Sequence, residues 1–410
     1  NIPISQYPNI PISQYPNINS TFNHHTMNNS FFTELLQNAP SRIVNSQSPC
    51  GMLLDKNEMS EDVHVRIKRQ VVESLMDADW NRYPNADSKD IEAAVAAYCG
   101  LNPEQIVLGP GSASIITTLL NYFALNNKRI VIAQPSYTLF DYHCKTYNIP
   151  YEPWHLTPEL EYDYDNMPAL GAGSVLIVTT PNNPVGNCME REQLEHILRT
   201  NPDSFVLVDA VYAEFADEDF TPLVNKYDNL LVLRSFSKAF PIAGLRFGYL
   251  CANPQTAAIV RKLMLQFSIN HFTQFFAREV LFSAEFMLQS RRQVQVIKTE
   301  RNRVYRYLTY KFDNSVLKVF RSHGNFLLIR IFDDASFQKL MKDFEESGIK
   351  VLNTSPFPLL KNTFRVSIGS EQENDAVVDC MLKSVGYQLP DIKLFAGWAQ
   401  TSTPLNPVGI

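Results

Sequence analysis

Cysteine is scarce in this sequence and is not arranged in pairs. The 410 residues contain six cysteines, no two of which are spaced as Cys-x-x-Cys, and the eight histidines form no pattern of metal ligands. Scattered cysteines are typical of reduced thiols in an intracellular protein rather than of a disulfide framework. We therefore predict a cytoplasmic protein that holds no metal ion.

Long apolar runs and blocks of one charge are also missing. The longest apolar stretches, such as residues 174–180, are far shorter than the roughly 20 residues that a membrane-spanning helix needs. The formal net charge is −6 and no cluster of Lys or Arg stands out, which argues against a surface that binds nucleic acid. We predict neither a membrane nor a nucleic acid as a partner.

The N-terminus carries a perfect repeat, because residues 1–8 (NIPISQYP) recur as residues 9–16. Two prolines in each unit exclude a helix and leave little apolar surface for a core. We interpret residues 1–26 as a segment upstream of a native start near Met27, the alternative being an arm that docks on a partner subunit. Residues 27–54 are predicted to pack against a smaller domain.

Helical and extended patterns alternate from residue 55 to 283. Apolar residues recur at helical spacing from Ser60 to Leu75 and from Asp87 or Ser88 to Tyr98. Short apolar strands are predicted at residues 106–108, 129–132, 174–178, 205–208 and 230–233. This alternation predicts an α/β fold, in which helices cover both faces of a mostly parallel sheet and ligands bind at the carboxyl ends of the strands.

A second, smaller α+β domain is predicted over residues 284–386. A long helix at 284–311 leads into two strands and two further helices, the last capped by Gly386. The strands are expected at 325–331 and 363–368, and the helices at 335–346 and 371–385. Residues 387–410 are predicted to form an irregular tail.

Polar side chains at two predicted strand ends suit a phosphate-bearing aldehyde cofactor. The amine of Lys238 can form a Schiff base, and Ser235, Ser237 and Arg246 nearby can hold a phosphate. Asp209 ends an apolar strand, where a carboxylate is costly to bury without a positive partner such as a protonated pyridine nitrogen. The alternatives are a solvated lysine and an aspartate that caps the next helix.

Residues at three more predicted strand ends could also bind such a cofactor. The glycine-rich turn at residues 109–114 opens a helix and exposes backbone N–H groups to an anion. Tyr137 can stack on a planar ring, and the amide of Asn183 can donate to a ring oxygen. Each group also has an ordinary interpretation as a connecting turn or a core residue. Their joint occurrence at one sheet edge is what favours a cofactor site.

With this constellation, five segments resemble the fold-type I aminotransferases of class I/II that use pyridoxal 5′-phosphate (PLP), most closely the histidinol-phosphate aminotransferase branch. The segments are NRYPNADS at 81–88, IVLGPGS at 106–112, PNNP at 181–184, SFSKAFPIAGLRFG at 235–248 and FRVSIGS at 364–370. The similarity runs over residues 52–386. It implies a ping-pong exchange of an amino group between an amino acid, or a related amine, and a 2-oxo acid.

The resemblance also implies a role for each candidate residue. Lys238 would hold PLP and carry a proton between the substrate Cα and the cofactor C4′, while Asp209 would pair with the pyridine nitrogen. Tyr83 would reach the cofactor phosphate of a neighbouring subunit, which implies a homodimer. The other implied contacts are to the phenolic oxygen (Tyr212, Asn183), the ring face (Tyr137), the phosphate (Ser112, Ala113, Ser235, Ser237, Arg246) and the substrate (Arg365, Asn57).

Departures from that branch leave the substrate open. About a dozen residues before Arg365, where the branch usually carries a second arginine, the chain reads Val351-Leu352. The usual Asp-Glu pair after the glycine-rich turn is Ala113-Ser114. A pocket lined by aromatic or imidazole groups is suggested by three later residues, which also suit a core or a dimer interface: Phe267, His271 and Phe272.

Two alternative functions share this fold. The first is a PLP-dependent decarboxylase of amino acids or amino-acid phosphates, which differs only in the bond that is broken at Cα. The second is a non-catalytic PLP-binding regulator with a basic DNA-binding domain ahead of the fold. The regulator is disfavoured because residues 1–54 contain a single Lys or Arg, Arg42.

Overall fold

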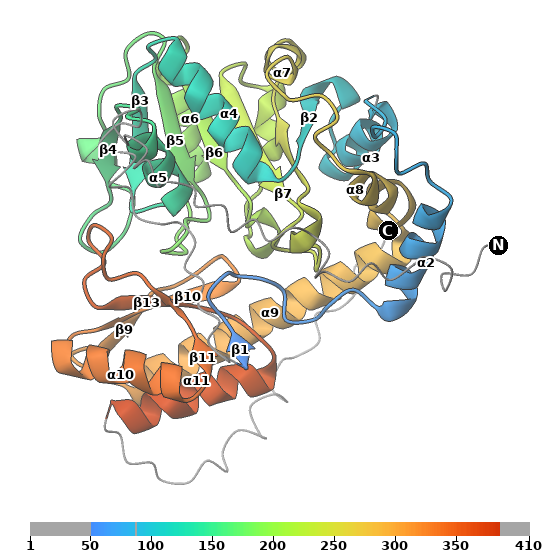
Figure 1. Ribbon diagram of the computed structural model, residues 1–410. Helices are drawn as coiled ribbons and strands as arrows, with labels where there is room; N and C mark the ends of the chain where they lie inside the picture. The colour runs from blue at the N-terminus through green and yellow to red at the C-terminus, as the bar shows by residue number, and fades with distance from the viewer. Residues whose placement is uncertain (1–50, 87, 386–410) are drawn as a thin grey trace, which may run out of the picture.

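The computed structural model describes residues 51–86 and 88–385 and is built around two main sheets (Figure 1). The larger sheet has seven strands in the order β2-β8-β7-β6-β5-β3-β4. The strands are β2 (Ile106–Gly109), β3 (Ile130–Gln134), β4 (Glu152–His155), β5 (Val175–Thr179), β6 (Phe205–Asp209), β7 (Leu230–Ser235) and β8 (Gly248–Cys251). The pairs from β7 to β4 are parallel, and β8 runs antiparallel to both of its neighbours.

The mostly parallel sheet predicted from the sequence is confirmed, and each of the five predicted strands extends one or two residues further at its carboxyl end. Two strands of this sheet were missed. In β4, Trp154 is the one buried residue, so no apolar run marks the strand. In β8 the run is only four residues long, too short to separate from a loop by pattern alone.

Both faces of the large sheet are covered, as the alternation along each strand requires. In β5, Val175 and Ile177 pack on one face with the helices α4 (Ser112–Leu125), α5 (Thr138–Thr146) and α7 (Pro254–Arg261). Leu176 and Val178 point to the other face and share a core with α6 (Arg191–Thr200) and α3 (Lys89–Cys99). Strands buried on both faces explain the continuous apolar runs in the sequence.

The helix α2 (Val65–Met76) begins later than predicted. Its N-cap is His64 rather than Ser60, and the His64 side chain accepts from the Arg66 N–H. Val63 is buried before the helix, and its N–H donates to the Asp62 carboxylate at 2.7 Å, so residues 62 and 63 lie ahead of the first helical turn. The second predicted helix agrees with α3, which ends at Gly100 with φ 67°; Asp87 lies outside the described residues.

The C-terminal part holds a four-stranded antiparallel sheet in the order β12-β13-β10-β9. Its strands are β9 (Leu317–Val319), β10 (Phe326–Ile331), β12 (Leu352–Asn353) and β13 (Thr363–Ser367). The helix α9 (Ala284–Lys311) leads into it with the predicted bounds, and α10 (Asp334–Glu346) and α11 (Glu371–Ser384) lie on the side of this sheet that faces away from the large sheet (Figure 1). The predicted cap Gly386 lies outside the described residues.

Short elements connect the two parts. β1 (Met52–Leu53) pairs in parallel with β11 (Ile349–Lys350), which ties the chain just before the large sheet to the C-terminal part. Between β8 and α9, α8 (His271–Phe276) packs against α2. Among the helices of residues 51–86 and 88–385, none is both long and apolar enough to span a membrane.

Candidate active site

Most of the candidate residues from the sequence line one cavity of about 400 Å³ between the two parts of the molecule. The carboxyl ends of β3, β5, β6 and β7 lie at one edge because these strands are parallel. Since β8 is antiparallel, Arg246 just before it reaches the same edge, and β13 adds Arg365 from the other part. The candidates that line the cavity are Ser112, Ala113, Tyr137, Asn183, Asp209, Tyr212, Ser235, Ser237, Lys238, Arg246 and Arg365.

Two candidates do not line the cavity. Asn57 is fully buried behind Tyr212, to whose hydroxyl its Nδ2 donates at 2.9 Å, while its Oδ1 accepts from Ser367 Oγ at 3.0 Å. Tyr83 is 79% exposed and stacks on Phe267 with ring centroids 4.9 Å apart. Asn57 therefore contacts Tyr212 and Ser367 without lining the cavity, and Tyr83 lies on the outer surface of this chain.

The aromatic pocket suggested by the sequence is not part of this cavity. Phe267, His271 and Phe272 are absent from its lining. His271 Nε2 lies 3.1 Å from the Arg82 carbonyl, and the Phe267 ring stacks on the ring of Tyr83. These residues lie on α8 or shortly before it, and Phe267 and Phe272 are partly exposed at the surface.

Lys238 is held at the base of the cavity, three residues after β7 ends. Its Nζ donates to the main-chain oxygen of Lys56 at 2.8 Å and lies 6.0 Å from the centre of the Tyr212 ring. Burial lowers the pKa of Lys238 to about 8, and the nearby guanidiniums of Arg365 and Arg246 act in the same direction. An amine with this pKa is neutral often enough near neutral pH to act as a nucleophile and a base.

Asp209 presents a carboxylate oxygen with no partner. The residue is 1% exposed, and its Oδ1 makes no hydrogen bond among the described residues. Burial raises the pKa of Asp209 to about 7, although the Val211 N–H and Lys238 oppose the shift. Because Tyr212 is the N-cap of the following turn, Asp209 is not a helix cap. A buried, unsatisfied oxygen at a cavity wall suits a cationic N–H donor from a ligand.

The start of α4 forms a cradle for an anion. Its N-cap is Gly111, with φ 82° and no side-chain cap, so no capping side chain occupies the N–H groups of Ser112 and Ala113, two residues that line the cavity. A Cβ at Gly111 would lie 2.7 Å from Arg246 Nη2, and one at Gly248 would overlap the backbone N of Ser112. Both glycines are therefore needed to bring a guanidinium and a helix N-terminus to the same place.

Arg365 is a buried cation without an ionic partner. It is 5% exposed, its Nη1 donates to Asn183 Oδ1 and its Nη2 to the Asp55 main-chain oxygen. Its Nε is unpartnered, and it forms no ion pair in the described part of the chain. Because Arg365 holds the oxygen of the Asn183 amide, the amide nitrogen is left to donate elsewhere in the cavity.

Comparison with known proteins decides the family. The family model described as "Aminotransferase class I and II" matches residues 50–380. The chain belongs to this family. The histidinol-phosphate aminotransferase of Pyrococcus furiosus is 30% identical to it over 350 residues, which cover 85% of the chain and 96% of that relative.

Solved structures share the fold of this aminotransferase. The histidinol-phosphate aminotransferase of Sinorhizobium meliloti in complex with PLP matches with a TM-score of 0.72 at 20% identity, over 87% of this chain and 98% of that one. The L-threonine-O-3-phosphate decarboxylase of Porphyromonas gingivalis matches with a TM-score of 0.68 at 20% identity, over 81% and 98%. The predicted fold-type I architecture, the enzyme class and the PLP cofactor are confirmed.

The cavity of the aminotransferase fits PLP on its own chemistry. The unsatisfied Oδ1 of Asp209 suits the protonated ring nitrogen, and the cradle of Gly111 and Arg246 suits the phosphate. Lys238 supplies an amine that burial makes partly neutral. Asp209, Lys238, Arg246 and the start of α4 at Ser112 all line one cavity, so one bound ligand can reach all of them.

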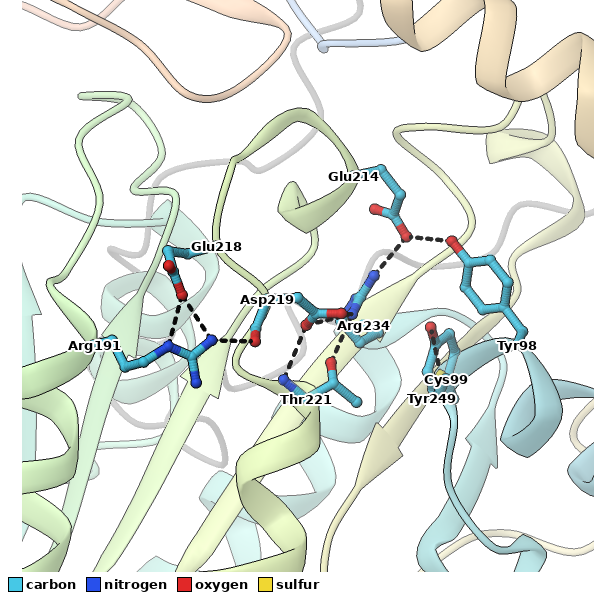
Figure 2. A network of polar contacts seen from close by, with 9 residues as sticks. All are labelled: Tyr98, Cys99, Arg191, Glu214, Glu218, Asp219, Thr221, Arg234 and Tyr249. Atoms are coloured by element: carbon cyan, nitrogen blue, oxygen red, sulfur yellow. Dashed lines mark hydrogen bonds and ion pairs between the residues drawn. The ribbon is translucent and has the colours of Figure 1, made fainter. Parts of the chain in front are cut away.

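A second polar network surrounds Arg234 in β7, four residues before Lys238 in the sequence (Figure 2). Arg234 is 4% exposed in β7, and its guanidinium donates to Glu214 Oε1 at 2.7 Å, to Asp219 Oδ1 at 3.0 Å and to Thr221 Oγ1 at 2.6 Å. Tyr98 donates to the same Glu214 oxygen at 3.1 Å. The sequence analysis missed this network. The only local feature of the sequence that indicates it is Arg234, a charged residue that follows four apolar residues in β7.

Replacing Arg234 with methionine is expected to destabilise the fold by about 3–5 kcal/mol, because it leaves the Glu214 and Asp219 carboxylates without their buried partner. Urea unfolding of the PLP-loaded protein measures the change. The matched control is Arg191→Met, which breaks a partly exposed ion pair with Glu218 in the same network and should cost at most about 1 kcal/mol. Equal losses for both variants would contradict the prediction.

Proposed function

We propose that this aminotransferase takes its amino group from an amine that carries a carboxylate and passes it to a 2-oxo acid in two half-reactions. The observation that carries the proposal is Arg365, a buried guanidinium that faces the cofactor cavity without an ion pair in the described residues. Burying an unpaired cation is costly. A substrate carboxylate, bound as a forked pair, would offset that cost.

The residues that line the cavity then contact different parts of the bound cofactor. When bound, PLP supplies an aldehyde carbon that condenses with amines and a ring that accepts an electron pair from Cα. The Asp209 carboxylate keeps a proton on the ring nitrogen, and the Tyr212 hydroxyl and the Asn183 amide donate to the phenolic oxygen. Ser112, Ala113 and the residues around Arg246 hold the phosphate. Tyr137 covers the face of the ring.

Lys238 is proposed as the base that moves the proton at the substrate Cα. The Arg365 contact orients the carboxylate and so sets which Cα bond faces this amine. With the Cα–H bond toward Lys238, the proton leaves and the donor departs as a 2-oxo acid that takes its carbonyl oxygen from water. The amino group stays on the enzyme until the acceptor 2-oxo acid removes it.

A single half-reaction tests this function. The PLP-loaded enzyme is mixed with one amine at a time from a panel of histidinol phosphate, aromatic amino acids, glutamate and phosphothreonine, and the cofactor absorbance and the products are followed. A lasting change of the absorbance band together with a 2-oxo product would support transamination. Release of carbon dioxide with recovery of the starting band would instead make the chain a decarboxylase and overturn the proposal.

We also propose a homodimer in which Tyr83 reaches the cofactor of the other subunit. Tyr83 is 79% exposed and lies outside the cavity of its own chain, yet its ring is fixed by the stack on Phe267. Tyr83→Phe is expected to weaken PLP binding without changing the fold, because it removes a hydroxyl donor to the phosphate.

Mixing Tyr83→Phe with Lys238→Ala tests the shared site, at a PLP concentration too low to load the Tyr83→Phe homodimer. Hybrids of Tyr83→Phe and Lys238→Ala should regain activity, because one of their two sites then has both native residues. Sedimentation should give about twice the chain mass of 46.7 kDa. A fully active monomer, or no regain of activity in hybrids that do form, would contradict the proposal.

A further inference from the structure

Resting on the proposed function, we propose that the amine donor is an α-amino acid with an apolar side chain that carries no phosphate. The residues that select it are Leu352 and Phe357, which line the cavity from the C-terminal part of the molecule. Three observations lead there: the register of two strands, the nature of the neighbouring side chain, and the balance of charge at this end of the cavity.

The strand register places Leu352 directly beside the substrate guanidinium. β12 and β13 are antiparallel, and Leu352 is the partner of Arg365 across the ladder. Directly opposite residues point to the same face with Cβ atoms about 4.5–5.5 Å apart, and both of these side chains line the cavity. A donor whose carboxylate is held by Arg365 therefore has an isobutyl group next to its point of attachment.

Phe357 extends this apolar wall. It follows β12 after a turn in which its N–H donates to the Thr354 carbonyl at 3.0 Å. Leu352 and Phe357 are each only partly buried in the described structure, so each keeps apolar surface turned to the cavity. Covering that surface with an apolar side chain is favourable, whereas a phosphate placed there would lose its water without gaining hydrogen bonds.

The charged residues at this end of the cavity offer a phosphate no second guanidinium beside Arg365. Apart from Lys238, Asp209 and Arg246, which are assigned to the cofactor, the charged lining residues are Asp55, Lys56, Glu58 and Arg365. Asp55 is already paired with Lys350 at 3.4 Å, and the Lys56 ammonium is opposed by the Glu58 carboxylate. A phosphate dianion beside the donor carboxylate would therefore find no second guanidinium to hold it as a forked pair.

Two unreactive ligands test the inference without turnover. 3-Phenylpropionate and 3-phosphonopropionate carry the same carboxylate and differ only in the group at the far end, and calorimetric titration of the PLP-loaded enzyme gives both affinities. The wild type is expected to bind 3-phenylpropionate at least about tenfold more tightly. Leu352→Arg places a second guanidinium beside Arg365, and the preference should reverse.

The controls separate this inference from the proposed function. Leu352→Met conserves volume and should keep the wild-type preference, and Leu352→Lys replaces the arginine variant if that one does not fold. Equal or tighter binding of the phosphonate by the wild type would overturn the inference, even if the enzyme yields 2-oxo products. Carbon dioxide release from phenylalanine would overturn transamination while leaving the apolar preference standing.

Discussion

Lys238→Ala is expected to lower the turnover of this aminotransferase by about 10³-fold or more while PLP still binds. The variant removes the amine that moves the proton at the substrate Cα, and positioned acid–base groups contribute about 10²- to 10⁴-fold on their own. The phosphate cradle at Gly111 and Arg246 stays intact, so the cofactor is held without a covalent bond. Turnover is measured with the best donor of the panel, and PLP binding by equilibrium dialysis.

Lys56→Ala provides the matched control for the lysine. Lys56 lines the same cavity, but the bond from Lys238 goes to its main-chain oxygen, which the substitution keeps. Turnover should fall far less in this variant than in Lys238→Ala. Wild-type turnover in Lys238→Ala would remove the central assignment, and loss of PLP binding there would show that the phosphate cradle is too weak to hold the cofactor alone.

Asp209→Asn is expected to reduce turnover by about 10- to 10³-fold without harm to the fold. A neutral amide cannot hold a proton on the ring nitrogen, and removing an opposite charge at contact distance shifts a pKa by about 1–3 units. In the protein without cofactor, burial raises the pKa of Asp209 to about 7 from its ordinary value of 3.8. The folded form therefore binds the proton more tightly than the unfolded chain does.

The sign of that shift gives a second readout for Asp209. The protonated Asp209 carboxyl contributes fully to the free energy of unfolding below pH 3.8, and this contribution is lost as the pH rises to about 7. Above pH 7 the charged carboxylate therefore destabilises the fold. Without cofactor, Asp209→Asn should thus be at least as stable as the wild type at pH 8. Urea unfolding with and without PLP checks this, with Asp219→Asn as a control outside the cavity. A destabilised, fully active Asp209→Asn would mean that the carboxylate is only structural.

Local patterns were sufficient to predict five of the seven strands of the large sheet and one edge of the site. Apolar runs mark buried strands, and the residue that follows such a run stands at the strand's carboxyl end whatever the rest of the fold does. Asp209, Asn183 and Lys238 were located in this way, and parallel pairing then required them to share an edge. The start of α2 was misplaced because Ser60 is a possible cap by type, while packing of Val63 decided the first turn.

The sequence by itself determined which groups could hold PLP, because residue type and position at a strand end are local properties. The tertiary structure alone decided how the site is completed, since the contacts concerned join distant segments. Asn57 bonds to Tyr212 from 155 residues away and to Ser367 from 310 residues away, and Arg365 fixes Asn183 across 182 residues. The register that sets Leu352 beside Arg365 depends on how β12 pairs with β13, and no local pattern specifies which residues meet across two strands.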